Sequence, residues 1–247
     1  MKMERSSTIR EKIVKAFMLT LAFCAICVSS TQLHAETVFA NLDQVSGWES
    51  CTVCAGANGN GPTAKYAMTE NVASPSIDGR SARFSISGSK PYSDALWWKQ
   101  LGPHNSATNF VYDLSFYYTN ASAPQALEFD VNQTVNGKWF IFGTQCDIRS
   151  SHQWQVWNAH AGWKNTGVSC VAPKPYVWNH LTWEFQRVNG QVRFVSLTYN
   201  GQKHYINQTY APRTGGSDQL NVAFQMDMNN SATAYQVWLD KVSLTVW

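Results

Sequence analysis

Acids and amides alternate with apolar residues in two short segments of this sequence, 127–132 and 222–229. Because successive side chains of a β-strand point to opposite faces, the polar side chains of each segment share one face. Glu128 and Asp130 are two positions apart, so their carboxyl groups repel one another. This raises the pKa of one of them, as acid–base catalysis often requires. The same face could instead hydrogen-bond to the hydroxyl groups of a ligand. The polar side chains concerned are Glu128, Asp130, Asn132, Gln225, Asp227 and Asn229.

Tryptophan accompanies polar side chains on two further strand-like faces. A buried tryptophan is usually surrounded by Leu, Ile and Val, whereas tryptophan among amides and acids suits a flat ligand with polar edges, such as a sugar ring. If the polar faces belong to one sheet, they form a carbohydrate-binding surface; the alternative is an ordinary solvated sheet face. One tryptophan face carries Gln153, Gln155 and Trp157, and the other carries Gln236, Trp238 and Asp240. The predicted carbohydrate-binding residues are Glu128, Asp130, Asn132, Gln153, Gln155, Trp157, Gln225, Asp227, Gln236 and Trp238.

The elements that must position these residues are strands. Short runs of Val, Ile, Thr, Phe, Tyr and Trp with a period of two recur along the chain, and helix signals are nearly absent after the first 35 residues. Asn189-Gly190 and Asn200-Gly201 mark two hairpins, because Asn-Gly supplies the positive φ angles of a two-residue turn. The pattern predicts an all-β fold, a two-sheet antiparallel jelly-roll sandwich. The predicted strands are 37–42, 82–87, 94–100, 110–119, 125–132, 138–146, 153–158, 178–188, 191–199, 202–208, 220–229 and 234–246.

One of these strands resembles part of a known family. Glu128-Phe-Asp130-Val-Asn-Gln133 is similar to the Glu-x-Asp-x-x-Glu strand of the retaining β-glucanases among the concanavalin A-like lectin/glucanase sandwiches. The resemblance implies a concanavalin A-like fold, with Glu128 as nucleophile and Asp130 tuning the site. Gln133 stands where the family has its acid/base Glu, and Asn132 stands there in the variant with the shorter spacing. Neither amide can transfer a proton at neutral pH, so the resemblance favours a lectin-like binding protein over a hydrolase.

Two enzymatic alternatives remain open. A glycoside hydrolase could use Glu128 and Asp130 with a second carboxylate from Asp227 or Glu184. Glu128, Asp130 and Asp227 are then the candidate catalytic residues. A polysaccharide lyase needs a neutralising amide and a basic group. The groups available for a lyase are Gln133, His152, His160 and several tyrosines. We expect binding without cleavage, and no required cofactor.

The C-terminal segment also carries a resemblance. Residues 237–246 are similar to the closing strand of many β-sandwich carbohydrate-binding modules, in which an acidic residue often helps to hold a structural Ca²⁺. Asp240 is the position that carries over. The resemblance therefore implies a structural calcium site at Asp240.

The first 35 residues have the layout of a secretory signal peptide. Five basic residues lie in 1–15, an apolar run covers 16–28, and small residues lead to a cleavage site after Ala35. The apolar run is shorter than the roughly 20 residues of a membrane span; an uncleaved N-terminal anchor is the alternative. We therefore expect a secreted or periplasmic protein whose mature chain, 36–247, is a single domain.

The charge balance restricts the partners. The whole chain carries +3, and segment 1–15 alone has five basic and two acidic residues, so the mature chain is near neutral. No basic stripe remains for nucleic acid or for an anionic membrane surface. The expected partner is a polysaccharide or glycan of low charge, with no nucleic acid and no membrane after signal cleavage. We expect a monomer.

Four cysteines follow the predicted cleavage site, Cys51, Cys54, Cys146 and Cys170. An even number in an exported chain predicts disulfides. Of the three connectivities, we favour Cys51–Cys54 with Cys146–Cys170, since each pair brackets a local loop. A thioredoxin-type redox pair would need a βαβ context, and a zinc site would need a second close pair. These two remain as alternatives.

Overall fold

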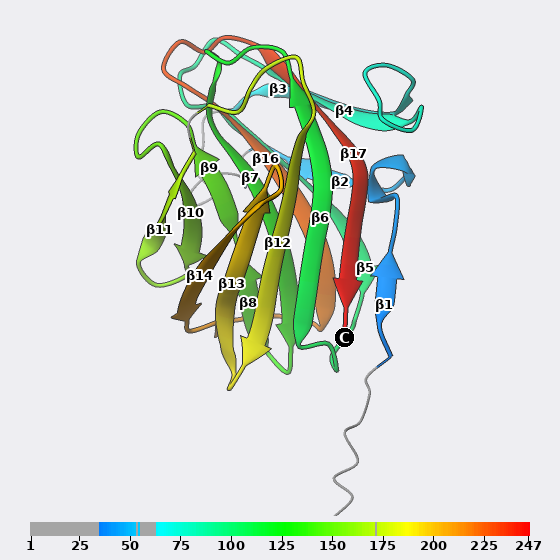
Figure 1. The fold of residues 1–247 in the computed structure, drawn as a ribbon, viewed down its shortest axis with the longest axis vertical. Coiled ribbons are helices and arrows are strands. Elements are labelled where there is room, and N and C mark those ends of the chain that lie inside the picture. The colour runs from blue at the N-terminus through cyan, green and yellow to red at the C-terminus, as the bar shows by residue number, and fades with distance from the viewer. Residues whose placement is uncertain (1–34, 53, 55–62, 171) are drawn as a thin grey trace, which may run out of the picture. The chain divides into compact units, whose positions relative to one another are not determined.

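The computed structural model describes residues 35–52, 54, 63–170 and 172–247. Within them, two antiparallel sheets form the predicted β-sandwich (Figure 1). The helical structure of this part of the chain is one 3₁₀ turn, η1 (Leu42–Gln44). None of the helices in these ranges is long and apolar enough to cross a membrane. The predicted signal segment, up to His34, lies outside the described residues.

Sheet I has the strand order β14-β13-β12-β6-β17-β4-β3, with β1 paired to β17. Figure 1 shows β6, β12, β13 and β17 side by side in this sheet. Its strands are β1 (Thr37–Phe39), β3 (Lys65–Val72), β4 (Ser81–Ser87), β6 (Asn109–Tyr118), β12 (Asn179–Val188), β13 (Gln191–Tyr199), β14 (Gln202–Tyr210) and β17 (Tyr235–Val246).

Sheet II has the order β11-β10-β9-β7-β16-β5-β2, with β8 paired to β7 and β15 paired to β8. Its strands are β2 (Glu49–Cys51), β5 (Asp94–Gly102), β7 (Pro124–Val135), β8 (Lys138–Phe142), β9 (Thr144–Asp147), β10 (Gln153–Asn158), β11 (Gly162–Ser169), β15 (Arg213–Thr214) and β16 (Gln219–Met228).

The core lies between the two sheets and is rich in aromatic rings. Phe84 of sheet I meets Phe224 of sheet II with ring centroids 5.0 Å apart, and Phe116 meets Phe129 at 5.2 Å. These side chains are fully buried. Edge-to-face and tilted ring pairs contribute about 0.5–1.5 kcal/mol each beyond the apolar area they bury. Because the side chains of a strand alternate, this core leaves every second residue of β7 and β16 on the outer face of sheet II.

The Asn-Gly hairpins are confirmed. Asn189 and Gly190 have φ angles of 51° and 70°, and Asn200 and Gly201 have 48° and 84°. These turns join β12 to β13 and β13 to β14, and they fix the register of that half of sheet I.

Four strands were not predicted: β2, β3, β11 and β15. Three of them are edge strands, and β15 has only two residues. An edge strand buries little of its surface, so its sequence carries more polar residues and a weaker apolar period. The predicted strand 138–146 is in fact two strands, which Gly143 separates.

Both predicted disulfides are present. The Cα atoms of Cys51 and Cys54 are 5.8 Å apart, and those of Cys146 and Cys170 are 5.6 Å apart. The first disulfide joins cysteines that are 3 positions apart in the sequence, and the second joins cysteines that are 24 positions apart. Two disulfides are typical of proteins from oxidising, extracytoplasmic compartments.

Removing the disulfide that closes the longer loop should destabilise the protein more than removing the other disulfide. Replacing Cys146 and Cys170 together by Ala is expected to lower the free energy of unfolding by about 3.5 kcal/mol, against about 2 kcal/mol for Cys51 and Cys54, because the longer loop restricts the unfolded chain more. Urea denaturation of the two double variants measures this difference. Equal losses would show that the loop length does not set the stabilisation.

Candidate functional site

The outer face of sheet II carries polar and aromatic side chains in rows that cross the strands. The register places Gln225 of β16 opposite Glu128 of β7, and Glu128 opposite Gln145 of β9. Gln145 in turn lies opposite Gln155 of β10. We name this set, Gln225, Glu128, Gln145 and Gln155, the amide row.

A second row lies two residues further along the strands and contains indoles. Trp98 of β5 lies opposite Ala223 of β16, and Ala223 lies opposite Asp130 of β7. On β10 and β11, Trp157 and Trp163 lie opposite one another, with ring centroids 5.0 Å apart. We name these residues the tryptophan row.

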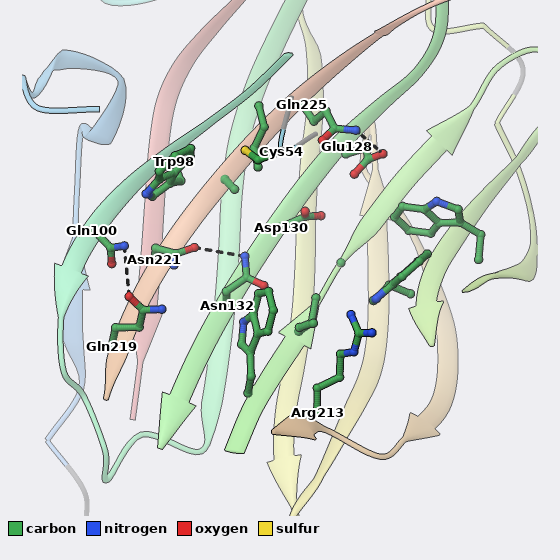
Figure 2. A pocket seen from close by; sticks show the side chains of 17 residues that line it. Cys54, Trp98, Gln100, Glu128, Asp130, Asn132, Arg213, Gln219, Asn221 and Gln225 are labelled. Carbon is green, nitrogen blue, oxygen red and sulfur yellow. Dashed lines mark hydrogen bonds between the residues drawn. The ribbon is translucent and has the colours of Figure 1, made fainter. Parts of the chain in front are cut away.

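A cavity of about 520 Å³ runs over the tryptophan row and over Gln225 and Glu128 of the amide row (Figure 2), and we name it the tryptophan groove. Asn132 donates a hydrogen bond to Asn221 at 3.1 Å, and Gln100 donates one to Gln219 at 3.3 Å, so these amides also present polar groups to the groove. Among its lining residues are Trp98, Trp139, Trp157, Trp163, Gln100, Glu128, Asp130, Asn132, Arg213, Gln219, Asn221 and Gln225. Flat apolar rings between fixed hydrogen-bonding groups suit a sugar chain.

Gly143 positions Trp157. The Trp157 backbone N–H donates to the Gly143 carbonyl at 2.9 Å. A Cβ atom at position 143 would stand only 2.9 Å from Trp157 Cβ. Because real Cβ contacts are not so short, a side chain at this position would displace the indole. The glycine that divides β8 from β9 therefore also allows Trp157 to lie against the groove floor.

Glu128, Asp130 and Asp227 carry carboxyl groups with raised pKa values. Burial raises the pKa of Asp130 to about 7 and that of Asp227 to about 7. For Glu128, burial and then the neighbouring charges of Asp227 and Asp130 raise the pKa well above its usual value. A hydrogen bond between the Glu128 and Asp227 carboxyl groups raises the pKa of Glu128 and lowers that of Asp227.

Gln225 holds these two acids together. Its Nε2 donates to Glu128 Oε1 at 2.8 Å and to Asp227 Oδ1 at 2.9 Å. Figure 2 shows Gln225 and Glu128 side by side at one end of the groove. Asp130 is fixed separately, because the Thr144 backbone N–H donates to it at 2.9 Å.

A second cavity, of about 370 Å³, adjoins this end of the groove, and we name it the acidic pocket. Glu128, Gln225 and Trp163 line both cavities. The carboxyl groups that line the acidic pocket are those of Asp94, Glu128, Asp147 and Asp227. Burial raises the pKa of Asp94 to about 6.

Most of the predicted binding residues meet at these cavities. Glu128, Asp130, Asn132, Trp157 and Gln225 line the groove, and Gln155 and Asp227 line the acidic pocket. Gln153 is not among the described residues that line either cavity; its Oε1 accepts a hydrogen bond from Gly167 N at 3.1 Å.

The prediction that Gln236 and Trp238 share one surface with the other binding residues is wrong. Both lie on β17 of sheet I, whereas the groove lies on sheet II. Trp238 is only 7% exposed and packs edge-on against Tyr117, with centroids 5.7 Å apart. The alternation of tryptophan with polar residues marked a packed sheet face here, because neighbouring aromatic side chains cover the indole.

Two predicted enzymatic partners are also misplaced. Glu184 lies on β12 of sheet I and pairs with Lys203 at 2.6 Å, so it cannot act with Glu128. Gln133 is fully buried, and its amide donates to the backbone carbonyls of His104 and Ala107. From Leu127 to Gln133 the odd-numbered residues of β7 point to the core, so Gln133 cannot reach the groove. Neither His152 nor His160 appears among the described lining residues of the groove or of the acidic pocket.

Several lining residues were missed. Asn221 shares a face with Gln225 by the same period of two, so the pattern could have found it. Trp163 lies on the edge strand β11, and Arg213 on the two-residue strand β15, neither of which the pattern predicted. These two residues reach the groove through long-range pairing that a local pattern does not record.

Asp240 lies on β17, away from both cavities, and is fully buried. Its Oδ2 accepts hydrogen bonds from Ser76 Oγ at 2.7 Å and from the Ile77 backbone N–H. Asp43 is also fully buried, and its Oδ1 accepts from Val242 N at 2.9 Å. Asp43 Oδ2 and Asp240 Oδ1 have no hydrogen-bond partner among the described residues. The two carboxyl groups are close enough for Asp240 to affect the pKa of Asp43.

No family model matches this chain, and no curated protein sequence matches it. Solved structures share its fold. One is a carbohydrate esterase from the Shiga toxin-encoding bacteriophage phi24B, which is 18% identical over 86% of this chain and 99% of that chain, with a TM-score of 0.50. Another is an endo-β-1,4-glucuronan lyase from the fungus Trichoderma reesei, which is 12% identical over 83% of this chain and 94% of that chain, also with a TM-score of 0.50. At these identities the likeness shows the fold alone, a two-sheet β-sandwich.

Proposed function

We propose that this protein is exported and binds a polysaccharide in the tryptophan groove without cleaving it. The tryptophan row carries this proposal. Trp98, Trp157 and Trp163 lie over a cavity of about 520 Å³, and amides border the row on both sides. Indole faces stack on the apolar faces of sugar rings, and amides both donate to and accept from their hydroxyl groups.

A panel of polysaccharides tests this proposal. The mature chain, 36–247, is incubated with immobilised neutral and charged polysaccharides, and both retention of the protein and release of new reducing ends are measured. We expect retention by at least one polysaccharide, without new reducing ends. Retention by none of them would refute the proposal.

The two acids that Gln225 bridges, Glu128 and Asp227, favour a second candidate function, glycoside hydrolysis. A carboxyl group that keeps its proton near neutral pH can act as a general acid, and an ionised neighbour can act as base or nucleophile. Asp130 is the third carboxyl group of this set. In this candidate function the amides Asn132 and Gln133 do not exclude hydrolysis, because Asp227, on another strand, is the second carboxylate.

Glu128→Gln separates the two functions. If the protein only binds, we expect no cleavage by the native protein and a changed affinity at most, because an amide keeps most of the hydrogen bonds of a carboxyl group but not its proton or its charge. Cleavage by the native protein that falls by orders of magnitude in Glu128→Gln would establish hydrolysis instead. Cleavage that survives the substitution would exclude Glu128 from both roles.

We also propose that Asp240 holds a structural Ca²⁺ together with Asp43. Carboxylate oxygens are ligands that Ca²⁺ prefers, and each of these buried side chains has one oxygen without a hydrogen bond in the described residues. Calcium would neutralise two acids that otherwise repel one another.

Adding 1 mM CaCl₂ to protein treated with EDTA should therefore raise the melting temperature, because a ligand that binds only the folded state stabilises it. Asp240→Asn should abolish this rise, whereas Asp218→Asn, at a residue hydrogen-bonded to Asn105 on another part of the surface, should keep it. An unchanged melting temperature in the native protein would contradict the site.

A further inference from the structure

The acidic pocket gathers negative charge without a matching cation. Asp94, Glu128, Asp147 and Asp227 line it, and no Lys, Arg or His is among its described lining residues. In the adjoining groove the one basic lining residue in the described ranges is Arg213, on β15. The backbone of Arg213 lies opposite Trp139, which in turn lies opposite Thr134 of β7. Thr134 is six residues from Glu128, so the two backbone positions are roughly 20 Å apart along β7. No basic side chain among the described lining residues therefore pairs with the acids of the acidic pocket.

The register leaves a space between these acids. Asp94 lies opposite Asp227, Asp227 lies opposite Ala126, and Ala126 lies opposite Asp147. Adjacent strands are about 4.8 Å apart, so Asp227 and Asp147 flank Ala126 at roughly 10 Å from each other. A methyl group between two carboxyl groups leaves room for a small cationic group that can approach either of them.

One acid in this pocket has a carboxylate oxygen without a hydrogen bond in the described residues. Asp94 is only 6% exposed, and its Oδ1 has no hydrogen-bond partner in the described part of the chain. Asp147, by contrast, is held by the backbone N–H groups of Ser150 and Ser151 at 3.1 and 2.7 Å. A buried acceptor without a donor is costly, so the pocket favours a ligand that brings N–H donors to Asp94.

Two aromatic side chains narrow the class of ligand. Tyr92 and Trp163 line the acidic pocket beside the carboxyl groups. Aromatic faces attract cations, and alkylammonium groups in particular, at sites that also carry negative charge. A metal ion is the alternative occupant of this cluster of acids, and the calorimetry described below distinguishes it from an ammonium group. A uronic acid would place a further negative charge among four acids.

We propose that the acidic pocket binds the protonated amino group of an amino sugar, so that the polysaccharide held in the tryptophan groove contains hexosamine units with free amines. This inference rests on the proposed binding function and names its ligand class. An ammonium group beside Asp227, which lies between Asp94 and Ala126 in the register, donates to Asp227 and Asp94. The sugar ring continues over Trp163 into the groove, since Trp163 lines both cavities.

Four β-1,4-linked hexasaccharides that differ in one substituent test the inference. They are the hexamers of glucosamine, N-acetylglucosamine, glucose and glucuronic acid. Isothermal titration calorimetry with the native protein, in EDTA and at low ionic strength, should give at least tenfold tighter binding of the glucosamine hexamer than of the N-acetylglucosamine hexamer. This preference should shrink in 0.5 M NaCl, because salt screens the charge pair. The glucuronic acid hexamer should bind most weakly.

Charge-neutral variants connect the preference to the pocket. Asp227→Asn and Asp94→Asn should each remove most of the glucosamine preference, measured as the ratio of the affinities for the glucosamine and N-acetylglucosamine hexamers. Asp113→Asn, on β6 of sheet I, is the matched control and should keep the preference. Circular dichroism confirms that the variants are folded.

The outcomes distinguish this inference from the proposed function. Equal affinity for the glucosamine and N-acetylglucosamine hexamers, or tightest binding of the glucuronic acid hexamer, would overturn the inference while leaving polysaccharide binding in place. A preference that appears only when Ca²⁺ replaces EDTA would also overturn it, in favour of a bridging metal ion. If none of the hexamers binds, the amine inference fails; if the polysaccharide panel fails as well, the proposed function fails with it.

Discussion

The free energy of unfolding is expected to fall as the pH rises from about 4 to about 7. Asp94, Glu128, Asp130 and Asp227 all have raised pKa values in the folded protein, chiefly because they are buried. In this range the folded protein binds more protons than the unfolded chain, so a rise in pH favours unfolding. The stabilisation is complete below the unfolded pKa, near 4, and is lost as the pH passes through the folded values of about 6 to 7.

Asp94 alone accounts for a measurable part of this effect. A pKa raised from 3.8 to about 6 corresponds to a change of about 2 kcal/mol in the free energy of unfolding between pH 4 and 7. Urea denaturation in EDTA at four pH values in this range should show the decline, and Asp94→Asn should reduce it. Glu49→Gln, at an exposed position on β2, should not. A free energy of unfolding that rises from pH 4 to 7 would show that these acids are ionised and paired in the folded protein.

Trp157→Ala is expected to weaken polysaccharide binding by about tenfold to a hundredfold. The indole lines the groove, packs on Trp163 and is placed by Gly143. Truncating an aromatic side chain at the centre of a binding site typically removes about 1–3 kcal/mol. Affinity electrophoresis or calorimetry with the polysaccharide that retains the native protein measures this loss.

Trp238→Ala is the informative comparison, because the same substitution falls on the other sheet. Trp238 is buried against Tyr117, so its loss should lower the free energy of unfolding by about 3 kcal/mol or more and leave the affinity unchanged in the folded fraction. Equal loss of affinity in both variants would place the ligand outside the tryptophan groove.

The sequence pattern identified the centre of the site better than its borders. Glu128, Asp130, Gln225 and Asp227 lie on long strands with a strict period of two, and β7 and β16 proved to be neighbours in the middle of sheet II. Such strands bury one face completely, so their apolar residues reveal which side chains point outward. The all-β sandwich and both disulfides were predictable for the same reason, from period, turn residues and the spacing of the cysteines.

The pairing of distant strands could not be predicted. Trp157 and Trp238 have the same local pattern, yet β10 belongs to sheet II and β17 to sheet I. A period of two reports which residues share a face of one strand but not which sheet that strand joins. The same limit applies to Glu184 and to Trp163, whose positions depend on strand order.

Gly143 has a mechanical consequence for ligand entry. It stands between β8, which carries Trp139, and β9, which connects to the strand of Trp157. The two walls of the groove are thus linked through one residue without a side chain, and β8 and β9 pair with different stretches of β7. The Gly143 carbonyl also accepts the backbone N–H of Trp157, so the backbone conformation at this joint sets the position of Trp157 relative to Trp139. A substitution at position 143 would therefore change the width of the groove as well as the position of one indole.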